Sequence, residues 1–156
     1  MSHYANLQTN ITDQEALIRA LCQMKNRNGH SITRNMIEVH DKAQHLFGYQ
    51  GDQRSQTANV IIRRQNVGGA ANDVGFVRGS NGKFQAIISE YDSGYYTAEW
   101  LAKMTTWYGV EKSKIELDAK GIKYVEGVDK AQGNCPTLEA FFEAPKAKKT
   151  VTNFFG

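Results

Sequence analysis

Alternation between hydrophobic and polar residues marks five segments of the chain. Side chains of a β-strand point in turn to its two faces, so an apolar residue at every second position predicts one buried face. This pattern predicts strands at residues 4–11, 36–47, 57–64, 73–78 and 84–91. Gly68-Gly69 and Ser80-Asn81-Gly82 separate the last three segments, and Asn-Gly between alternating runs is a strong hairpin signal. The centre of the chain is therefore predicted to be an antiparallel meander.

Two other segments have apolar residues three and four positions apart, which is the spacing of an amphipathic helix. The first covers residues 13–25 and follows Thr12, with Glu15 placed to complete a capping box. The second covers residues 98–120, where Thr97 can cap the first turn. Both helices are predicted to lay an apolar stripe on the sheet.

The remaining segments complete the prediction of the fold. Residues 122–126 predict a short strand, and residues 137–144 a strand or a short helix. The predicted class is α+β, with an antiparallel sheet of about five strands and two helices on one face. The order of the elements resembles a ferredoxin-like split βαβ unit with an enlarged central meander. Residues 1–144 are expected to form one domain, and residues 145–156 a flexible basic tail that ends in two phenylalanines.

Composition is that of an ordinary globular protein. The 156 residues are 40% hydrophobic and 22% charged, which is sufficient for a core without disulfides. No apolar run approaches the length of a membrane span, so no membrane contact is expected, and the N-terminus lacks the features of a signal peptide. Cys22 and Cys135 are isolated, which predicts reduced thiols in a cytoplasmic protein, with no metal site and no cofactor. The net charge of +3 permits nucleic-acid binding without indicating it.

An enzymatic hypothesis depends on one glutamate. Glu90 falls on the same side of its predicted strand as Phe84, and a carboxylate in register with a core face needs a partner. In this hypothesis Glu90 works as an acid–base group with His40, His45 or Tyr91. The competing structural interpretation is an ion pair between Glu90 and Arg63 or Arg64 across neighbouring strands. The sequence contains no phosphate-loop motif and no spacing typical of metal ligands.

A second hypothesis depends on arginines. Arg63 and Arg64 are expected to send one guanidinium to each side of the sheet, where they and Arg54 would contact an anion. Together with Arg78 and exposed tyrosines, they would bind nucleic acid through phosphates and base stacking. The competing interpretation is that the arginines form salt bridges and that the aromatic residues belong to a helix–sheet core. The aromatic residues concerned are Tyr91, Tyr95, Tyr96, Trp100 and Tyr108.

Three blocks of sequence carry a family resemblance that covers residues 1–126 in matching order. They are MSHYANLQTNITDQEAL, HLFGYQGDQRSQTANVIIRRQNVGGAANDVGF and AIISEYDSGYYTAEWL. With these blocks the chain resembles the hypothetical chloroplast reading frame family thirty-five, found in algal plastids, cyanobacteria, other bacteria and some phages. The resemblance implies a domain of unknown function with no catalytic residues to carry over. It also implies an accessory role beside AAA-type ATPases, in the cytoplasm, a plastid stroma or an infected host cell.

The tail carries a short motif of its own. Val151, Phe154 and Phe155 have the spacing of peptides that dock on DNA sliding clamps, in which one helical turn gathers an aliphatic and two aromatic side chains. Lys148 stands where such peptides usually have glutamine. The alternative is that both phenylalanines fold back onto the domain. The favoured prediction is a non-enzymatic accessory or adaptor protein whose partner is a protein, either a sliding clamp or an AAA-type ATPase.

Overall fold

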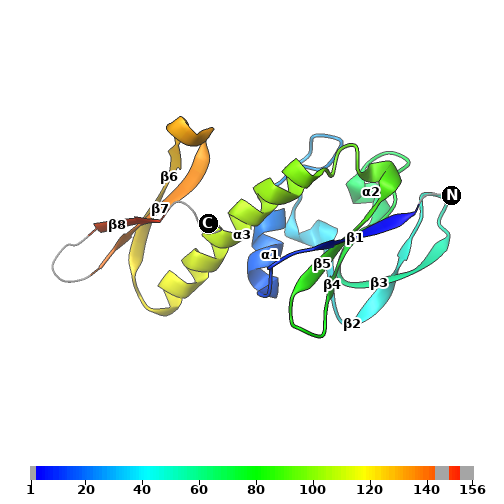
Figure 1. Cartoon of the computed structure of the whole chain (residues 1–156), viewed down its shortest axis with the longest axis horizontal. Helices are drawn as coiled ribbons and strands as arrows, with labels where there is room; N and C mark the ends of the chain where they lie inside the picture. Colours follow the sequence, from blue (N-terminus) through cyan, green and yellow to red (C-terminus); the bar gives the residue numbers. More distant parts are fainter. Residues whose placement is uncertain (1–2, 143–147, 152–156) are drawn as a thin grey trace.

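A five-stranded antiparallel sheet forms the centre of the structure (Figure 1). The structure, a computed structural model, describes residues 3–142 and the backbone of residues 148–151. An antiparallel sheet with helices packed against it confirms the predicted α+β class. From one edge to the other, the order of the strands is β1 (Tyr4–Gln8), β5 (Phe84–Ser89), β4 (Val74–Arg78), β3 (Gln53–Ile62) and β2 (Ile37–Phe47).

The two edge strands are joined by helix α1 (Gln14–Leu21). Every neighbouring pair in the sheet is antiparallel, so β1 and β2 run in the same direction at opposite edges. The meander β3–β4–β5 fills the space between them, which is the split βαβ arrangement with an enlarged centre that the element order predicts. Gly82 has a φ of 81° in the turn from β4 to β5, a conformation that glycine adopts without strain.

The main core lies between one face of this sheet and two helices. Phe76 and Phe84 from the sheet meet Leu17 and Leu21 of α1, and Met104 of α3 (Ala98–Ala119), and all of these side chains are fully buried. Burial of each such side chain stabilises the fold by roughly 1.5–3 kcal/mol. The apolar stripes at helical spacing therefore serve the purpose predicted for them, and α1 lies beside α3 in Figure 1.

The two helix starts differ in their agreement with the sequence pattern. Thr97 caps α3 as predicted. The N-cap of α1 is Asp13 instead of Thr12, and its carboxylate accepts a hydrogen bond from Ala16 N at 3.0 Å. The reason lies in the tertiary structure, because the hydroxyl of Tyr108 accepts hydrogen bonds from the backbone N–H groups of Thr12 and Asp13 at 3.1 and 2.9 Å. This contact fixes the start of α1 against α3.

On the opposite face of the sheet, β2 and β3 curl over the centre of the meander. The curl begins at a break in their pairing, where the amide of Asn59 donates hydrogen bonds to the backbone carbonyls of His40 and Asp41. A Cβ atom at Gly75 would lie 2.6 Å from the Cβ atom of Ala58, so the strands can approach only with glycine there. The curl brings residues 48–52 to the end of the sheet where β4 begins.

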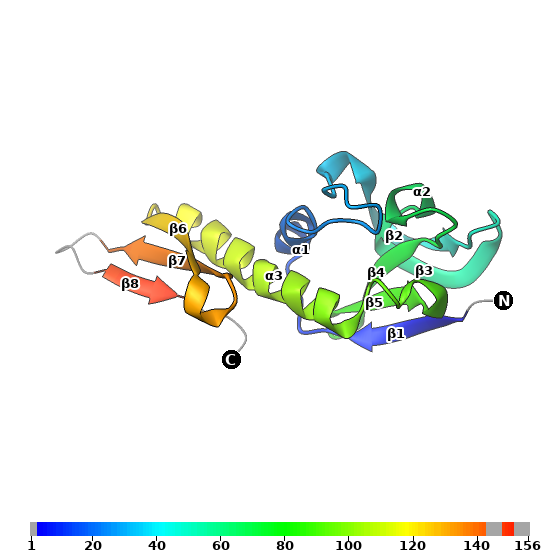
Figure 2. The same cartoon turned by 90° about the horizontal axis from the view of Figure 1, so that it is seen from above.

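A second, three-stranded sheet lies against the C-terminal half of α3, away from the main sheet (Figure 2). It contains β6 (Lys123–Asp129), β7 (Cys135–Phe141) and β8 (Lys148–Val151), all antiparallel. The segment predicted as a strand or a short helix is thus the strand β7. β8 lies inside the segment predicted to be a tail, and the backbone of its four residues pairs with the edge of β7.

Candidate functional site

Four loops meet at the end of the main sheet where β3 and β5 end and β4 begins. They contain residues 26–30, 48–52, 63–73 and 90–92, and we call the region that they form the four-loop surface. The loop 63–73 includes the one-turn helix α2 (Arg64–Val67), which Figure 1 shows at this end of the molecule. These loops are far apart in the sequence, and two buried carboxylates hold them together.

Asp73 is the first of these carboxylates, and its side chain is 1% exposed. It forms an ion pair with Arg63 at 2.8 Å and accepts hydrogen bonds from the backbone N–H groups of Arg64 and Phe47, both at 2.7 Å. Arg63 also binds Glu38 through two parallel hydrogen bonds of 2.9 Å. The hydrogen bonds to Arg63 lower the pKa of Glu38, and those to Glu38 raise the pKa of Arg63. Both groups are therefore held in their charged forms.

Asp92 is the second buried carboxylate, with a side chain that is 0% exposed. It pairs with Arg27 at 3.0 Å and accepts hydrogen bonds from the backbone and side-chain N–H groups of Asn72 at 3.0 and 3.1 Å. The side-chain oxygen of Asn72 accepts a hydrogen bond from Tyr49 N at 3.0 Å. Arg27 donates a further hydrogen bond to the carbonyl of Gly69. One chain of contacts thus links all four loops.

Gly68 and Tyr96 complete the attachment of the loop 63–73. A Cβ atom at Gly68 would lie 2.6 Å from Nε of Arg27, so a side chain there would displace the guanidinium from its contacts with Asp92 and Gly69. The hydroxyl of Tyr96 accepts a hydrogen bond from Arg27 N at 3.2 Å and donates one to the carbonyl of Val67 at 2.6 Å. Burial raises the pKa of Tyr96, so this hydroxyl keeps its proton and remains a donor.

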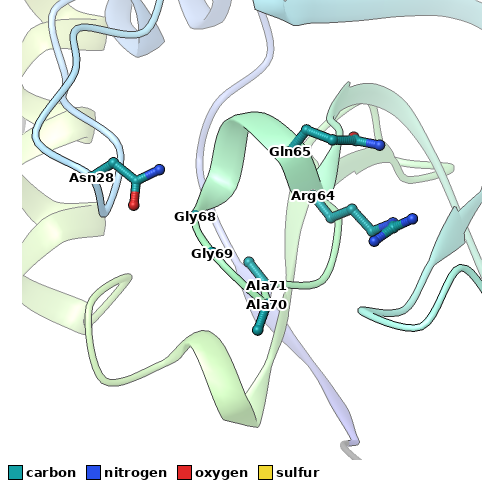
Figure 3. A pocket seen from close by; sticks show the side chains of 7 residues that line it. All are labelled: Asn28, Arg64, Gln65, Gly68, Gly69, Ala70 and Ala71. Atoms are coloured by element: carbon teal, nitrogen blue, oxygen red, sulfur yellow. The ribbon is translucent and has the colours of Figure 1, made fainter.

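Two surface hollows flank α2. The first has a volume of about 260 Å³ and is shown in Figure 3. Its lining residues are Asn28, Arg64, Gln65, Gly68, Gly69, Ala70 and Ala71. The second has a volume of about 270 Å³ and is lined by Phe47, Gly51, Arg63, Arg64, Gln65 and Asp73. Arg64 and Gln65 belong to both hollows, so α2 forms the ridge between them.

Arg64 differs from the other two arginines of the four-loop surface. Its Nη1 atom donates a hydrogen bond to the carbonyl of Tyr49 at 3.0 Å, and no carboxylate pairs with it in the described part of the chain. Figure 3 shows Arg64 and Gln65 extending from α2, with the amide of Asn28 on the far side of the loop. Neither amide side chain has a hydrogen-bond partner among the described residues. The hollows therefore carry polar groups that are available to a ligand.

Two exposed tyrosines stand at the same surface. Tyr49 is 47% exposed and Tyr91 is 59% exposed. Their rings are nearly parallel, with an angle of 16° and 6.4 Å between centroids. The guanidinium carbon of Arg27 lies 6.0 Å from the centroid of the Tyr91 ring. Tyr96, Trp100 and Tyr108, by contrast, are buried as the structural interpretation of these aromatic residues predicts.

Glu90 does not face the core, although its predicted register placed it there. β5 ends at Ser89, and the chain then forms a single 3₁₀ turn (Glu90–Asp92) that leaves Glu90 exposed and buries Asp92. The two arginines proposed as partners of Glu90 bind other groups. Arg63 forms ion pairs with Glu38 and Asp73, and Arg64 donates a hydrogen bond to the carbonyl of Tyr49. The acid that the alternation missed is therefore Asp92, because a turn after a strand breaks the period of two.

The other enzymatic candidates lie apart from Glu90. His40 and His45 belong to β2, which β4 and β3 separate from β5 in the sheet. His40 contacts Glu38 at 2.9 Å, and Nδ1 of His45 contacts the carbonyl of Arg54 at 2.7 Å. No group of three or more metal-ligating side chains occurs within the residues that the structure describes.

Of the four arginines proposed to bind anions, only two line the hollows beside α2. Arg63 and Arg64 are there, but outside β3, which ends at Ile62. Arg54 lies 5.3 Å from the ring centroid of Tyr4 and 3.8 Å from Asp52. Arg78 donates to Gln14 at 2.8 Å and lies over the ring of Phe84, at the other end of the sheet. These two arginines thus have structural contacts of their own.

The predicted docking residues of the tail are only partly within the structure. The backbone of Val151 ends β8 opposite Leu138, and Phe154 and Phe155 lie outside the described residues. A further hollow of about 600 Å³ lies between α3 and the turn from β6 to β7, lined by Trp107 and Cys135 among others.

Comparison with known proteins gives a family but no activity. Residues 32–136 match the model of a family described as protein of unknown function (DUF1257). This match spans more than half of the chain, so the chain belongs to that family. None of the curated proteins and none of the solved structures matches the chain. Within the described residues, every helix is too short or too polar to cross a membrane.

Proposed function

We propose that this DUF1257 protein is a non-enzymatic accessory protein that binds its partner through the four-loop surface. The observation that carries the proposal is the contrast between Arg64 and its neighbours. The charges of Arg27 and Arg63 are matched by buried carboxylates, whereas Arg64 lies between two hollows without one. An arginine in such a place offers a charged, directional contact to an incoming partner.

The acids of the surface favour binding over catalysis. A general acid or base must exchange a proton with a substrate, which requires a free lone pair or proton within hydrogen-bond reach. Asp73 and Asp92 are buried, and each accepts three hydrogen bonds from the protein. Their geometry suits the task of holding loops in place. The exposed Glu90 has no histidine or tyrosine hydrogen-bonded to its side chain among the described residues, which weakens the enzymatic hypothesis.

The resemblance to the chloroplast reading frame family supports an accessory role. Because genes of that family lie among genes for AAA-type ATPases in some bacteria, such an ATPase is our first proposed protein partner. A cytoplasmic protein, or a plastid or host-cell equivalent, agrees with two cysteines that form no disulfide in the described structure.

The tail is a second proposed binding element. Its spacing of Val151, Phe154 and Phe155 favours a sliding clamp as the partner. Clamp peptides bind as a helical turn, whereas the backbone of Val151 is part of β8. Docking in that mode therefore requires the end of β8 to separate from β7.

Affinity capture from the natural host tests both elements. The baits are the full chain, Arg64→Glu, a chain that ends at Pro145, and Lys83→Glu as the charge-matched control. Lys83 is exposed in the turn from β4 to β5, at the opposite end of these strands. We expect Arg64→Glu to lose a partner that Lys83→Glu retains. Loss on truncation alone would transfer the binding role to the tail, and equal recovery by all four baits would refute both proposals.

A further inference from the structure

We propose that the first hollow beside α2 binds the phosphate of a nucleoside phosphate, with the nucleobase stacked on the exposed tyrosine pair. This inference rests on the proposed function, because it names the chemistry that the four-loop surface recognises. Three observations carry it: a buried backbone donor without an acceptor, an arginine without a carboxylate, and exposed aromatic rings beside them.

The buried donor is the backbone N–H of Ala71. Ala71 is 1% exposed and lines the first hollow, yet no acceptor in the described part of the chain takes its N–H. Buried backbone donors without a partner are rare, and an ion or water usually explains them. The N–H groups of Gly69 and Ala70 also have no acceptor among the described residues. Three consecutive donors at one hollow suit an oxyanion.

The backbone of this loop has the character of an anion-binding turn. Ala70 has a φ of 54°, in the left-handed region that an L-residue seldom adopts. Successive N–H groups around a left-handed residue form the concave sites that bind phosphate in many proteins. The hydrogen bond from Arg27 to the carbonyl of Gly69 holds the loop in this conformation, and Asp92 in turn holds Arg27.

Charge favours the same hollow. Arg64 lines it, and the only hydrogen bond of its guanidinium in the described structure goes to a neutral carbonyl. Figure 3 shows this side chain extending away from Asn28, so a bound phosphate would draw it round the edge of α2. Phosphate is a stronger acceptor than a carbonyl, and guanidinium binds it through two parallel hydrogen bonds. Asn28 can donate from the other wall of the hollow.

The tyrosines point to a nucleoside as the group that carries the phosphate. The Arg27 guanidinium bonds the loop at Gly69 and also lies 6.0 Å from the Tyr91 ring centroid, so the ring adjoins the loop. Tyr49 lies against Tyr91 and is itself exposed. Flat nucleobases stack on such rings with little dependence on sequence. Among the three arginines that the described part of the chain places in the four-loop surface, Arg64 alone has no carboxylate partner, and one such cation suits one phosphate better than a long nucleic-acid backbone.

The test uses the full chain and NMR titration of the backbone amides. The probes are inorganic phosphate, adenosine, adenosine 5′-monophosphate and a single-stranded oligonucleotide. We expect the Ala71 amide signal to shift with phosphate and with the monophosphate, and the monophosphate to bind about tenfold more tightly than either part. Tyr91→Ala should remove this advantage and leave phosphate binding intact. Arg64→Ala should weaken binding of both phosphate-bearing probes about tenfold, and Lys83→Ala should not.

The outcomes separate this inference from the proposed function. The inference is overturned if the Ala71 signal shifts with none of the probes, or if Arg64→Ala binds the probes as tightly as the wild type. This holds even if capture from the host still depends on Arg64. In that case the proposed function stands and its partner offers another acidic group. Tighter binding of the oligonucleotide than of the monophosphate, with the same Ala71 shift, supports a nucleotide within a strand as the source. Far-ultraviolet circular dichroism of Arg64→Ala and Tyr91→Ala verifies that both variants fold.

Discussion

Asp92 offers the clearest measurement of how strongly the loops are held together. Replacing it by alanine removes a carboxylate that is 0% exposed and that accepts hydrogen bonds from Arg27 and from two N–H groups of Asn72. Breaking a buried ion pair from one side destabilises a protein by roughly 3–5 kcal/mol. Arg27 is 26% exposed and keeps its bond to Gly69, so we expect the lower end, about 3 kcal/mol.

Urea denaturation followed by tryptophan fluorescence measures this loss, since Trp100 is buried in the core. The melting temperature should fall by roughly 6–12 °C for a chain of this size. Glu15→Ala is the control, because Glu15 pairs with Arg19 and Arg34 at an exposed site and should contribute less than about 1 kcal/mol. If Asp92→Ala lowers the free energy of unfolding no more than Glu15→Ala does, the argument that a buried network organises the surface is refuted.

Three further predictions concern individual groups. Gly68→Ala should destabilise the fold by roughly 1–3 kcal/mol, because its Cβ atom would meet a guanidinium at 2.6 Å, whereas Gly69→Ala, with no atom within 4 Å, should be nearly neutral in the same urea titration. Hydrogen bonds from Arg63 lower the pKa of Glu38 in the folded state. The charged Glu38 side chain therefore stabilises the fold fully above its ordinary pKa of 4.5, and this stabilisation is lost as the pH falls through the pKa of the folded state. Glu38→Gln should therefore flatten the acid side of the stability profile, and an unchanged profile would contradict this. Tyr108→Phe should lower stability by roughly 1–3 kcal/mol in thermal melting, because two backbone donors at the start of α1 lose their acceptor.

The fold follows from the sequence wherever one face of an element is buried. Alternation located the five strands of the main sheet, and helical spacing located α1 and α3, because burial imposes those periods directly. The ends of the elements are harder to predict, because tertiary contacts determine where an element starts and stops. The hydroxyl of Tyr108 binds the backbone at the start of α1, where Asp13 is the N-cap. Four residues of the expected tail pair with β7 as β8.

The site was less accessible to sequence reasoning. The sequence predicts Arg63 and Arg64 as members of a strand, whereas their different environments depend on Asp73 and Glu38. Asp92 was missed because its partner Arg27 lies 65 positions earlier, and no local pattern reports such a contact. An aspartate at the end of the turn that follows a strand is the available signal, and it becomes informative only with the three-dimensional structure.

The long sequence distances within the four-loop surface also determine when that surface can form. As the chain leaves the ribosome, Arg27 emerges 65 residues before Asp92, and Glu38 emerges 25 residues before Arg63. Contacts of such separation form late, after the intervening chain has closed on itself. A nascent or truncated chain that stops before residue 92 contains all five strands of the main sheet and still lacks the carboxylate that holds Arg27 and Asn72. Under the proposed function, a chain without Asp92 therefore would not bind the partner, and binding would begin only after synthesis of the loop 90–92.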